Sequence, residues 1–238
     1  PEDTAIVKTL KMDDAPRNNQ ITQLAFSDGR LIVAAGGWEE GVSNWNTYKE
    51  TAISEYNPKT GWTHYAQPVS AATVRFLRPV RQIAVNPTNT KNIVVGTWGN
   101  GLFEYNNLQF VSNQTESNNP HVKSAIEGSA SYVVACGVTF AGDGSMYYLT
   151  SLTTEALCKR DVKSGEYSHL RQDLLLRNGA NGELTQMFVD SRGLVWFVND
   201  NYMSPALYCY DIQSNRLVEY NTFVNQSGTS VGSVYHVR

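Results

Sequence analysis

Short apolar stretches that run into polar turns recur along this chain about every fifty residues. Each stretch has the length of a β-strand and ends in Asp, Asn, Ser, Gly or Pro, which is typical of a strand followed by a tight turn. The four copies share an apolar landmark position, with steps of 59, 55 and 49 residues between Leu24, Ile83, Val138 and Met187. A repeat of this period carried by strands predicts a β-propeller.

A second motif repeats independently, later in each unit. It consists of Asn or Asp, then Ser or Thr, then Gly or Asn, and it begins at Asn57, Asp161 and Asp211. These residues suit a short hairpin, because an Asn or Asp side chain bonds the backbone two residues on and Gly or Asn tolerates positive φ. Between the two motifs lie β-branched and aromatic runs such as 92–96 and 194–198. We therefore predict blades of four antiparallel strands, named a to d from the axis outward.

The predicted fold class is all-β: a β-propeller of four-stranded antiparallel blades, with about four full blades and partial blades at both ends. The chain, 1–238, is expected to be a single propeller domain or a propeller segment. Residues 4–12 read as a strand left over from a preceding blade, and 231–238 as the first strand of a following one. These strands either complete a fifth blade together or belong to a larger propeller, which we favour. The expected full blades cover approximately 20–66, 80–112, 132–171 and 183–221.

Composition excludes several classes of partner and function. A net charge of −3 without a block of Lys or Arg gives no electrostatic footprint for nucleic acid. The longest apolar runs, such as 31–35, are strand-sized, whereas a membrane-spanning helix needs ~20 apolar residues. The cysteines show neither metal spacing nor the density of a disulfide framework, so we expect buried packing residues at Cys136, Cys158 and Cys209.

The connections between strands b and c differ from the other turns. In an antiparallel blade they share one face with the links from strand d to the next blade, while the short a–b and c–d turns lie on the opposite face. The b–c connections carry aromatic rings interleaved with amide and carboxylate groups. Such a surface suits sugar rings or a protein partner, because the rings offer apolar area and the amides fix orientation. The candidate binding residues are Trp38, Asn44, Trp45, Trp98, Asn100, Asn199, Asp200 and Tyr202.

Some tryptophans also have a structural interpretation. Glycine-flanked Trp98 could plug the gap between two blades. Trp38 and Trp45 lie in the longest connection, and connections of that length are more often functional than short ones. Trp62 and Trp196 fall within predicted strands, so we expect them in the core.

Motifs for catalysis are missing. The four histidines lie in different repeats or links, without metal-ligand spacing, and the chain has no nucleophile elbow, phosphate loop or zinc-protease motif. An acid pair for glycoside chemistry could still form in space, with Glu39, Glu40 and Asp200 as candidates. We expect a protein that is not an enzyme, with no catalytic residue, metal site or cofactor.

Two segments resemble the repeats of the two-component regulator propellers of Bacteroidota: Val80 to Tyr105, which contains Gly96-Thr97-Trp98-Gly99-Asn100-Gly101, and Leu184 to Phe197. Within that group, Ala35-Gly36-Gly37-Trp38, followed by a long loop and a strand at Gly61-Trp62, is similar to the amino-terminal propeller of PorZ-like proteins of the type IX secretion system. The resemblance covers most of the chain.

This resemblance implies a non-catalytic binding or scaffolding propeller outside the cytoplasm, in the periplasm or at the cell surface. The implied role is in protein secretion and cell-surface attachment. The implied partners are other secretion-system or cell-envelope proteins, and lipopolysaccharide or an oligosaccharide. Two alternatives stay open: a periplasmic glycan-sensing propeller of a hybrid two-component system, which uses the same repeat, and a polysaccharide-cleaving propeller enzyme.

Overall fold

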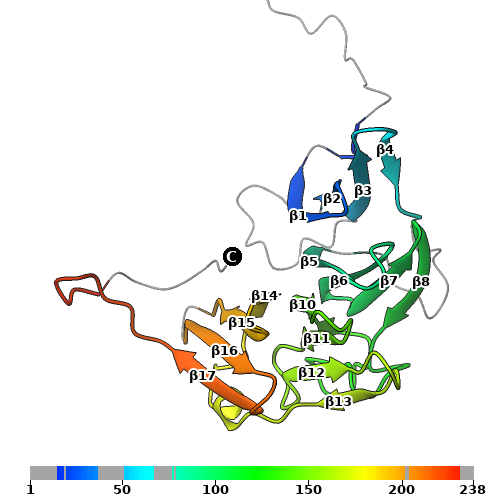
Figure 1. Ribbon diagram of the computed structural model, residues 1–238. Helices are drawn as coiled ribbons and strands as arrows, with labels where there is room; N and C mark the ends of the chain where they lie inside the picture. Colours follow the sequence, from blue (N-terminus) through cyan, green and yellow to red (C-terminus); the bar gives the residue numbers. More distant parts are fainter. Residues whose placement is uncertain are drawn as a thin grey trace, which may run out of the picture.

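The computed structural model describes residues 15–18, 20–36, 51–66, 77, 79–201 and 204–230 (Figure 1). These residues form β-strands and one short 3-10 helix, η1 (Asp173–Leu176). The strands build four sheets of antiparallel strands that follow one another around a common centre (Figure 1). The predicted all-β propeller fold is therefore confirmed.

Each sheet is one blade, with its strands hydrogen-bonded in chain order. Blades 1 and 2 comprise β1 (Ile21–Ser27), β2 (Arg30–Gly36), β3 (Thr51–Asn57), β4 (Gly61–His64), and β5 (Val80–Val85), β6 (Asn92–Gly99), β7 (Leu102–Asn106), β8 (Gln109–Gln114). Blades 3 and 4 comprise β10 (Gly137–Phe140), β11 (Met146–Leu149), β12 (Leu157–Arg160), β13 (Tyr167–His169), and β14 (Leu184–Val189), β15 (Leu194–Asn199), β16 (Ala206–Asp211), β17 (Arg216–Tyr220). A short extra strand, β9 (Val133–Val134), pairs with the end of β6.

The hairpins between strands c and d have the chemistry that the sequence predicts. Asp161 Oδ1 accepts the backbone N–H groups of Lys163 and Ser164 at 2.9 and 3.1 Å. Asp211 makes the equivalent bonds in blade 4. Gly165 and Asn215 then adopt the positive φ values, 71° and 51°, that close these turns.

Successive blades pack through apolar clusters between their faces. One cluster lies between blades 1 and 2, a second between blades 2 and 3, and a third between blades 3 and 4. The innermost strands contact one another in order: β1 with β5, β5 with β10, and β10 with β14. An ion pair, Arg160 Nη1 to Glu104 Oε2 at 2.9 Å, links blade 3 to blade 2. All three cysteines are buried and free, which confirms the prediction that they are packing residues.

Two tryptophans differ from their predicted place. Trp62 and Trp196 were expected in the core, but both are only half-buried. The ring of Trp62 lies 5.3 Å from that of Tyr56, and Trp196 stacks on Tyr220 at 6.2 Å. Their strands are where the sequence places them, but their side chains lie on the sides of blades 1 and 4 that face away from the neighbouring blade, where no apolar cluster of the described residues covers them.

Some sequence-based expectations concern residues that the structure does not describe. The partial blades at 4–12 and 231–238 lie outside the described residues. The single propeller domain or segment over 1–238 therefore stays a prediction. Within the described residues, no helix has the length and apolar character needed to cross a membrane.

Candidate functional site

The strand connections at one end of blades 2 to 4 are hydrogen-bonded to one another, and we call this end of the molecule the loop face. It comprises residues 98–101, 115–136, 150–156, 178–183 and 199–201. Backbone hydrogen bonds join its parts: Ser151 N–H donates to Val134 O at 2.9 Å, and Leu152 N–H donates to Asn181 O at 2.8 Å. The predicted grouping of these connections on one face therefore has a physical basis, since hydrogen bonds connect loops from three blades.

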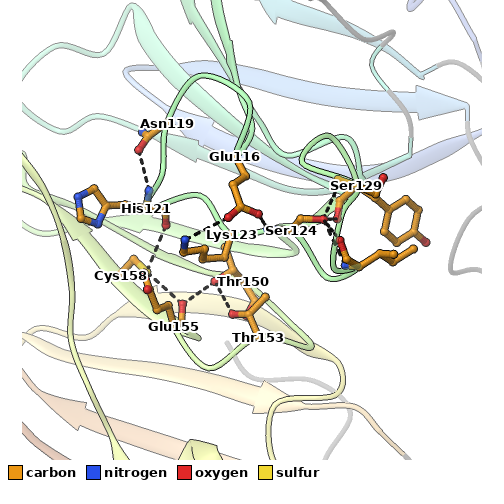
Figure 2. A network of polar contacts seen from close by, with 12 residues as sticks. Glu116, Asn119, His121, Lys123, Ser124, Ser129, Thr150, Thr153, Glu155 and Cys158 are labelled. Carbon is orange, nitrogen blue, oxygen red and sulfur yellow. Dashed lines mark hydrogen bonds and ion pairs between the residues drawn. The ribbon is translucent and has the colours of Figure 1, made fainter.

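The link between β8 and β10 is the longest described part of the loop face, and polar contacts fix its shape (Figure 2). The Glu116 carboxylate accepts the Ser124 backbone N–H at 2.9 Å and pairs with Lys123 Nζ at 3.0 Å. These two contacts lower the pKa of Glu116. The Ser124 hydroxyl lies 2.6 Å from the carbonyl oxygen of Ser129 and 2.9 Å from that of Tyr132. The link is thus held by its own side chains.

The same link is bonded to blade 3 (Figure 2). The carbonyl oxygen of His121 accepts the Tyr148 hydroxyl at 3.0 Å and lies 3.7 Å from Cys158 Sγ. The Thr150 hydroxyl donates to Glu155 O at 2.6 Å. Burial raises the pKa of the Cys158 thiol to about 12, so this group is protonated at neutral pH and is a poor nucleophile. These contacts give the network a structural role.

Within the part of the chain that the structure describes, no three His, Cys, Asp or Glu side chains are grouped so that they could hold a metal ion. The pKa of His169 is lowered by burial, so its imidazole is mostly neutral near pH 7.

Trp98 and Asn100 lie where β6 leaves blade 2. The backbone of Trp98 pairs with Val134 of β9, and its side chain is half-buried. The carbonyl oxygen of Asn100 accepts Asn113 Nδ2 at 2.8 Å. Gly101 is required between these contacts, because its φ is 76° and a Cβ there would lie 2.1 Å from Gln114 O. The backbone that carries Trp98 and Asn100 is therefore held in one conformation.

Asn199 is fully buried and holds the fourth b–c connection in place. Its Oδ1 accepts the Glu183 backbone N–H at 3.0 Å, and its Nδ2 donates to the carbonyl oxygens of Gly179 and Ser204, both at 2.8 Å. Because every polar atom of this amide is engaged inside the protein, Asn199 positions the loop and does not face the solvent.

Asp200 lies beside a second carboxylate, Glu183, that the sequence analysis did not single out. Asp200 N–H donates to Glu183 O at 2.9 Å, one residue beyond the last β14–β15 pair. Burial and the charge of Asp200 raise the pKa of Glu183 to about 7, while Arg81 opposes this rise. Glu183 Oε2 is buried and has no hydrogen-bond partner among the described residues. Glu183 can therefore both donate and accept hydrogen bonds near neutral pH.

Cys136 completes this group of ionisable side chains, because the charges of Arg81 and Glu183 both act on it. Burial raises the pKa of Cys136 to about 12. The antiparallel pairing of β14 with β15 places Glu183 beside Asp200. The arrangement of the blades around the axis brings Arg81 and Cys136 near them. The sequence signal for Glu183 was its place just before a repeated strand.

Two apolar side chains are exposed on the loop face. Ile126, in the link between β8 and β10, is 50% exposed, and Leu152, in the b–c connection of blade 3, is 51% exposed. They belong to the same loop face as Asp200 and Asn181. The loop face thus offers apolar contact area beside ionisable groups, the mixture found in protein interfaces.

The structure brings together only part of the predicted set. Asn199 and Asp200 are adjacent in blade 4, whereas Trp98 and Asn100 lie together in blade 2. The remaining binding candidates, Trp38, Asn44, Trp45 and Tyr202, and the acid-pair candidates Glu39 and Glu40 lie outside the described residues.

Comparison with known proteins identifies the fold. No protein-family model matches the chain, and no curated protein matches it by sequence. Among solved structures, it is similar to PorZ of Porphyromonas gingivalis, an essential bacterial surface component of the type IX secretion system, with a TM-score of 0.73 and 18% identity over 94% of this chain and 30% of that chain. The chain has a PorZ-like propeller fold. It spans less than a third of the PorZ chain.

Two further solved structures share the propeller at lower similarity. Virginiamycin B lyase of Staphylococcus aureus aligns with a TM-score of 0.57 and 13% identity, over 90% of this chain and 60% of that chain. The extracellular domain of a hybrid two-component system of B. thetaiotaomicron aligns with a TM-score of 0.51 and 14% identity, over 91% of this chain and 32% of that chain. At these identities the similarity, like that to PorZ, is one of fold, and function has to be argued from the site.

Proposed function

We propose that this chain is a non-catalytic propeller module, located outside the cytoplasm, that binds or scaffolds cell-envelope proteins as part of a PorZ-like protein of a type IX secretion system. The observation that carries the proposal is the match to PorZ along 94% of the chain at a TM-score of 0.73. The role in protein secretion and in attachment of cargo to the cell surface follows from this match as a hypothesis.

The loop face supports a binding role. Hydrogen bonds fix its longest link and join it to blade 3, so little conformational entropy is lost when a partner binds there. Ile126 and Leu152 supply exposed apolar contacts, and Asp200 and Glu183 supply groups that orient a partner. We therefore favour a cell-envelope protein as the main partner, with lipopolysaccharide or an oligosaccharide as a further ligand.

A second candidate function is glycan sensing in a hybrid two-component system. It is favoured by the pair Glu183 and Asp200, because carboxylic acids and carboxylates are well suited to bond sugar hydroxyl groups. The same pair would also be the starting point for a polysaccharide-cleaving enzyme, in which an acid of raised pKa works beside a carboxylate. Turnover of a polysaccharide that is lost in Asp200→Ala would support this third function.

Deletion of the gene in its source bacterium tests the proposal. We expect secreted cargo to accumulate inside the cell envelope and to be lost from the cell surface, with restoration by the intact gene. Normal secretion, together with loss of the transcriptional response to a host or dietary glycan, would contradict the proposal and favour the sensor. Purified protein offered the same glycan in calorimetry gives the matching direct measurement.

A further inference from the structure

The chain contains three asparagines that are each followed by glycine, at 100–101, 178–179 and 181–182. An asparagine in this position is chemically labile, because the backbone nitrogen of the next residue can attack the side-chain amide and glycine has no Cβ to hinder the approach. All three pairs belong to the loop face, so they share one kind of sequence and one end of the molecule. Their local structure decides which of them can react.

The glycine nitrogens of two pairs are engaged in backbone hydrogen bonds. Gly101 N–H donates to Val133 O at 3.0 Å, and Gly182 N–H donates to Gly179 O at 3.2 Å. An amide nitrogen held in this way becomes a nucleophile only after its hydrogen bond opens, and such local opening costs free energy. Both pairs are therefore protected.

Crowding adds to the protection of these two pairs. A Cβ at Gly101 would lie 2.1 Å from Gln114 O, and one at Gly182 would lie 2.4 Å from Asn201 Nδ2. Other atoms would therefore have to shift if either glycine moved. The side chain of Asn181 is held as well, since its Nδ2 donates to a carbonyl oxygen in the b–c connection of blade 3 at 2.5 Å.

Asn178 and Gly179 lack these restraints. Asn178 is exposed, in a turn that Ala180 N–H closes by donating to Arg177 O at 3.0 Å. Among the described residues, neither the Asn178 side chain nor Gly179 N–H has a hydrogen-bond partner. A Cβ at Gly179 would lie 3.4 Å from Ser204 Cβ, which is an ordinary contact distance. The amide nitrogen of Gly179 thus has room to approach Asn178 Cγ.

We propose that Asn178 is a deamidation site, which reacts with Gly179 and water through a cyclic succinimide. The deprotonated amide nitrogen of Gly179 attacks Asn178 Cγ, a C–N bond forms, and the side-chain nitrogen leaves as ammonia. Water then opens the ring, without oxidation or reduction. Hydrolysis at the former side-chain carbonyl gives aspartate, whereas hydrolysis at the main-chain carbonyl gives isoaspartate, in which the backbone runs through the side chain.

The two products should affect the loop face differently. Both add a negative charge, but only isoaspartate adds a methylene group to the backbone. The added length acts on Gly179 O, which accepts Nδ2 of the fully buried Asn199 at 2.8 Å. A displaced carbonyl would leave this buried amide short of a partner. Isoaspartate at 178 should therefore loosen the connections at 178–183 and 199–201, whereas aspartate should not.

Peptide mass spectrometry of the full chain, aged in heavy-oxygen water at mildly alkaline pH, tests the site. The heavy isotope marks deamidation that occurs during ageing, and an isoaspartate-specific methyltransferase marks the second product. We expect Asn178 to convert at least about tenfold faster than Asn100 and Asn181, because their glycine N–H groups must first open. In urea, where no structure protects them, the three asparagines should convert at similar rates. Equal rates in the folded protein would overturn the proposal, and so would an Asn178 that stays intact while the unfolded chain converts.

Hydrogen exchange measures the structural consequence, in isoaspartate-containing protein purified by ion exchange. Its amide hydrogens at 179–183 should exchange at least about tenfold faster than those of Asn178→Asp, which carries the same charge without the added methylene group. Equal exchange in the two proteins would contradict the effect on the bond between Asn199 and Gly179.

Discussion

Gln82 joins three of the four blades with a single side chain. Its Oε1 accepts the backbone N–H groups of Met187 at 2.9 Å and Val138 at 3.3 Å, and its Nε2 donates to Met187 O. It follows a register shift in β5, where the strand bulges. Its bonds reach strands 56 and 105 residues away in the sequence, so they depend on the fold and not on a local pattern.

Replacing this side chain should therefore destabilise the whole propeller. Gln82→Met keeps the approximate volume but leaves the buried N–H groups of Met187 and Val138 unsatisfied, which should lower the free energy of unfolding by about 1–3 kcal/mol. Urea unfolding measures the change. Gln109→Met, at an exposed position of β8, is the control and should change stability by no more than about 0.5 kcal/mol. Equal effects in the two variants would contradict the bridging role.

Glu183 should give the protein a specific pH dependence. Its pKa in the folded state is about 7, above the ordinary value of 4.5, so the folded state binds the extra proton. The resulting stability is present below pH 4.5 and is lost as the pH rises through 7. Glu183→Gln should remove this loss. The free energy of unfolding of the variant, relative to that of the parent protein, should therefore rise by about 1–2 kcal/mol between pH 4.5 and 8, a value reduced for partial solvent screening.

Unfolding curves at several pH values measure this difference. Glu127→Gln, an exposed residue of the link between β8 and β10, is the matched control and should follow the parent protein at every pH. A constant offset between Glu183→Gln and the parent would contradict the raised pKa of Glu183.

At the scale of elements, close backbone approach decides which residues the strands allow. A Cβ at Gly96 of β6 would lie 2.3 Å from the carbonyl oxygen of Ala135, so one of the two backbones would have to move. Gly142, in the a–b turn of blade 3, has nothing within 4 Å of the same position. The two glycines therefore make a matched pair.

Gly96→Ala should lower the free energy of unfolding by about 2–3 kcal/mol, because it overpacks the contact between β6 and the chain before β10. Gly142→Ala should change it by about 0.5 kcal/mol or less. Thermal unfolding of both variants checks the prediction. If Gly96→Ala leaves the free energy of unfolding nearly unchanged, the backbones of Gly96 and Ala135 lie further apart than the structure indicates.

The strands themselves could be predicted, while the contacts between connections could not. The runs at 92–96 and 194–198 and the turns at Asp161 and Asp211 carry local signals, namely β-branched residues and Asx turn chemistry, and the structure confirms them. Strand β9 and the link 115–136 depend on pairing with β6 and blade 3, which no local pattern specifies. Trp62 and Trp196 were misplaced because the pattern of a strand does not show whether a neighbouring blade covers it.

At the scale of the whole molecule, the repeat was enough to predict the propeller but not the site. The apolar landmarks recur in all four blades and the hairpin chemistry in three of them, so each copy supports the others. Three blades contribute to the group formed by Arg81, Cys136, Glu183 and Asp200. This group therefore depends on how the blades are arranged around the axis. Of these four residues, the sequence indicated only Asp200 as a binding residue.

We propose that partners of the propeller bind at its loop face. Secretion of cargo in the gene-deletion strain, after complementation with surface variants, measures whether this face is required. Ile126→Asp combined with Leu152→Asn removes the exposed apolar contacts of the loop face, and Asn suits the positive φ of 62° at residue 152. Val111→Asn combined with Val162→Asp makes the same kind of change at exposed positions away from the loop face.

We predict that the loop-face variant accumulates in folded form but fails to restore secretion, while the control variant restores it fully. Full restoration by the loop-face variant, at equal protein levels, would show that the loop face is not required for secretion.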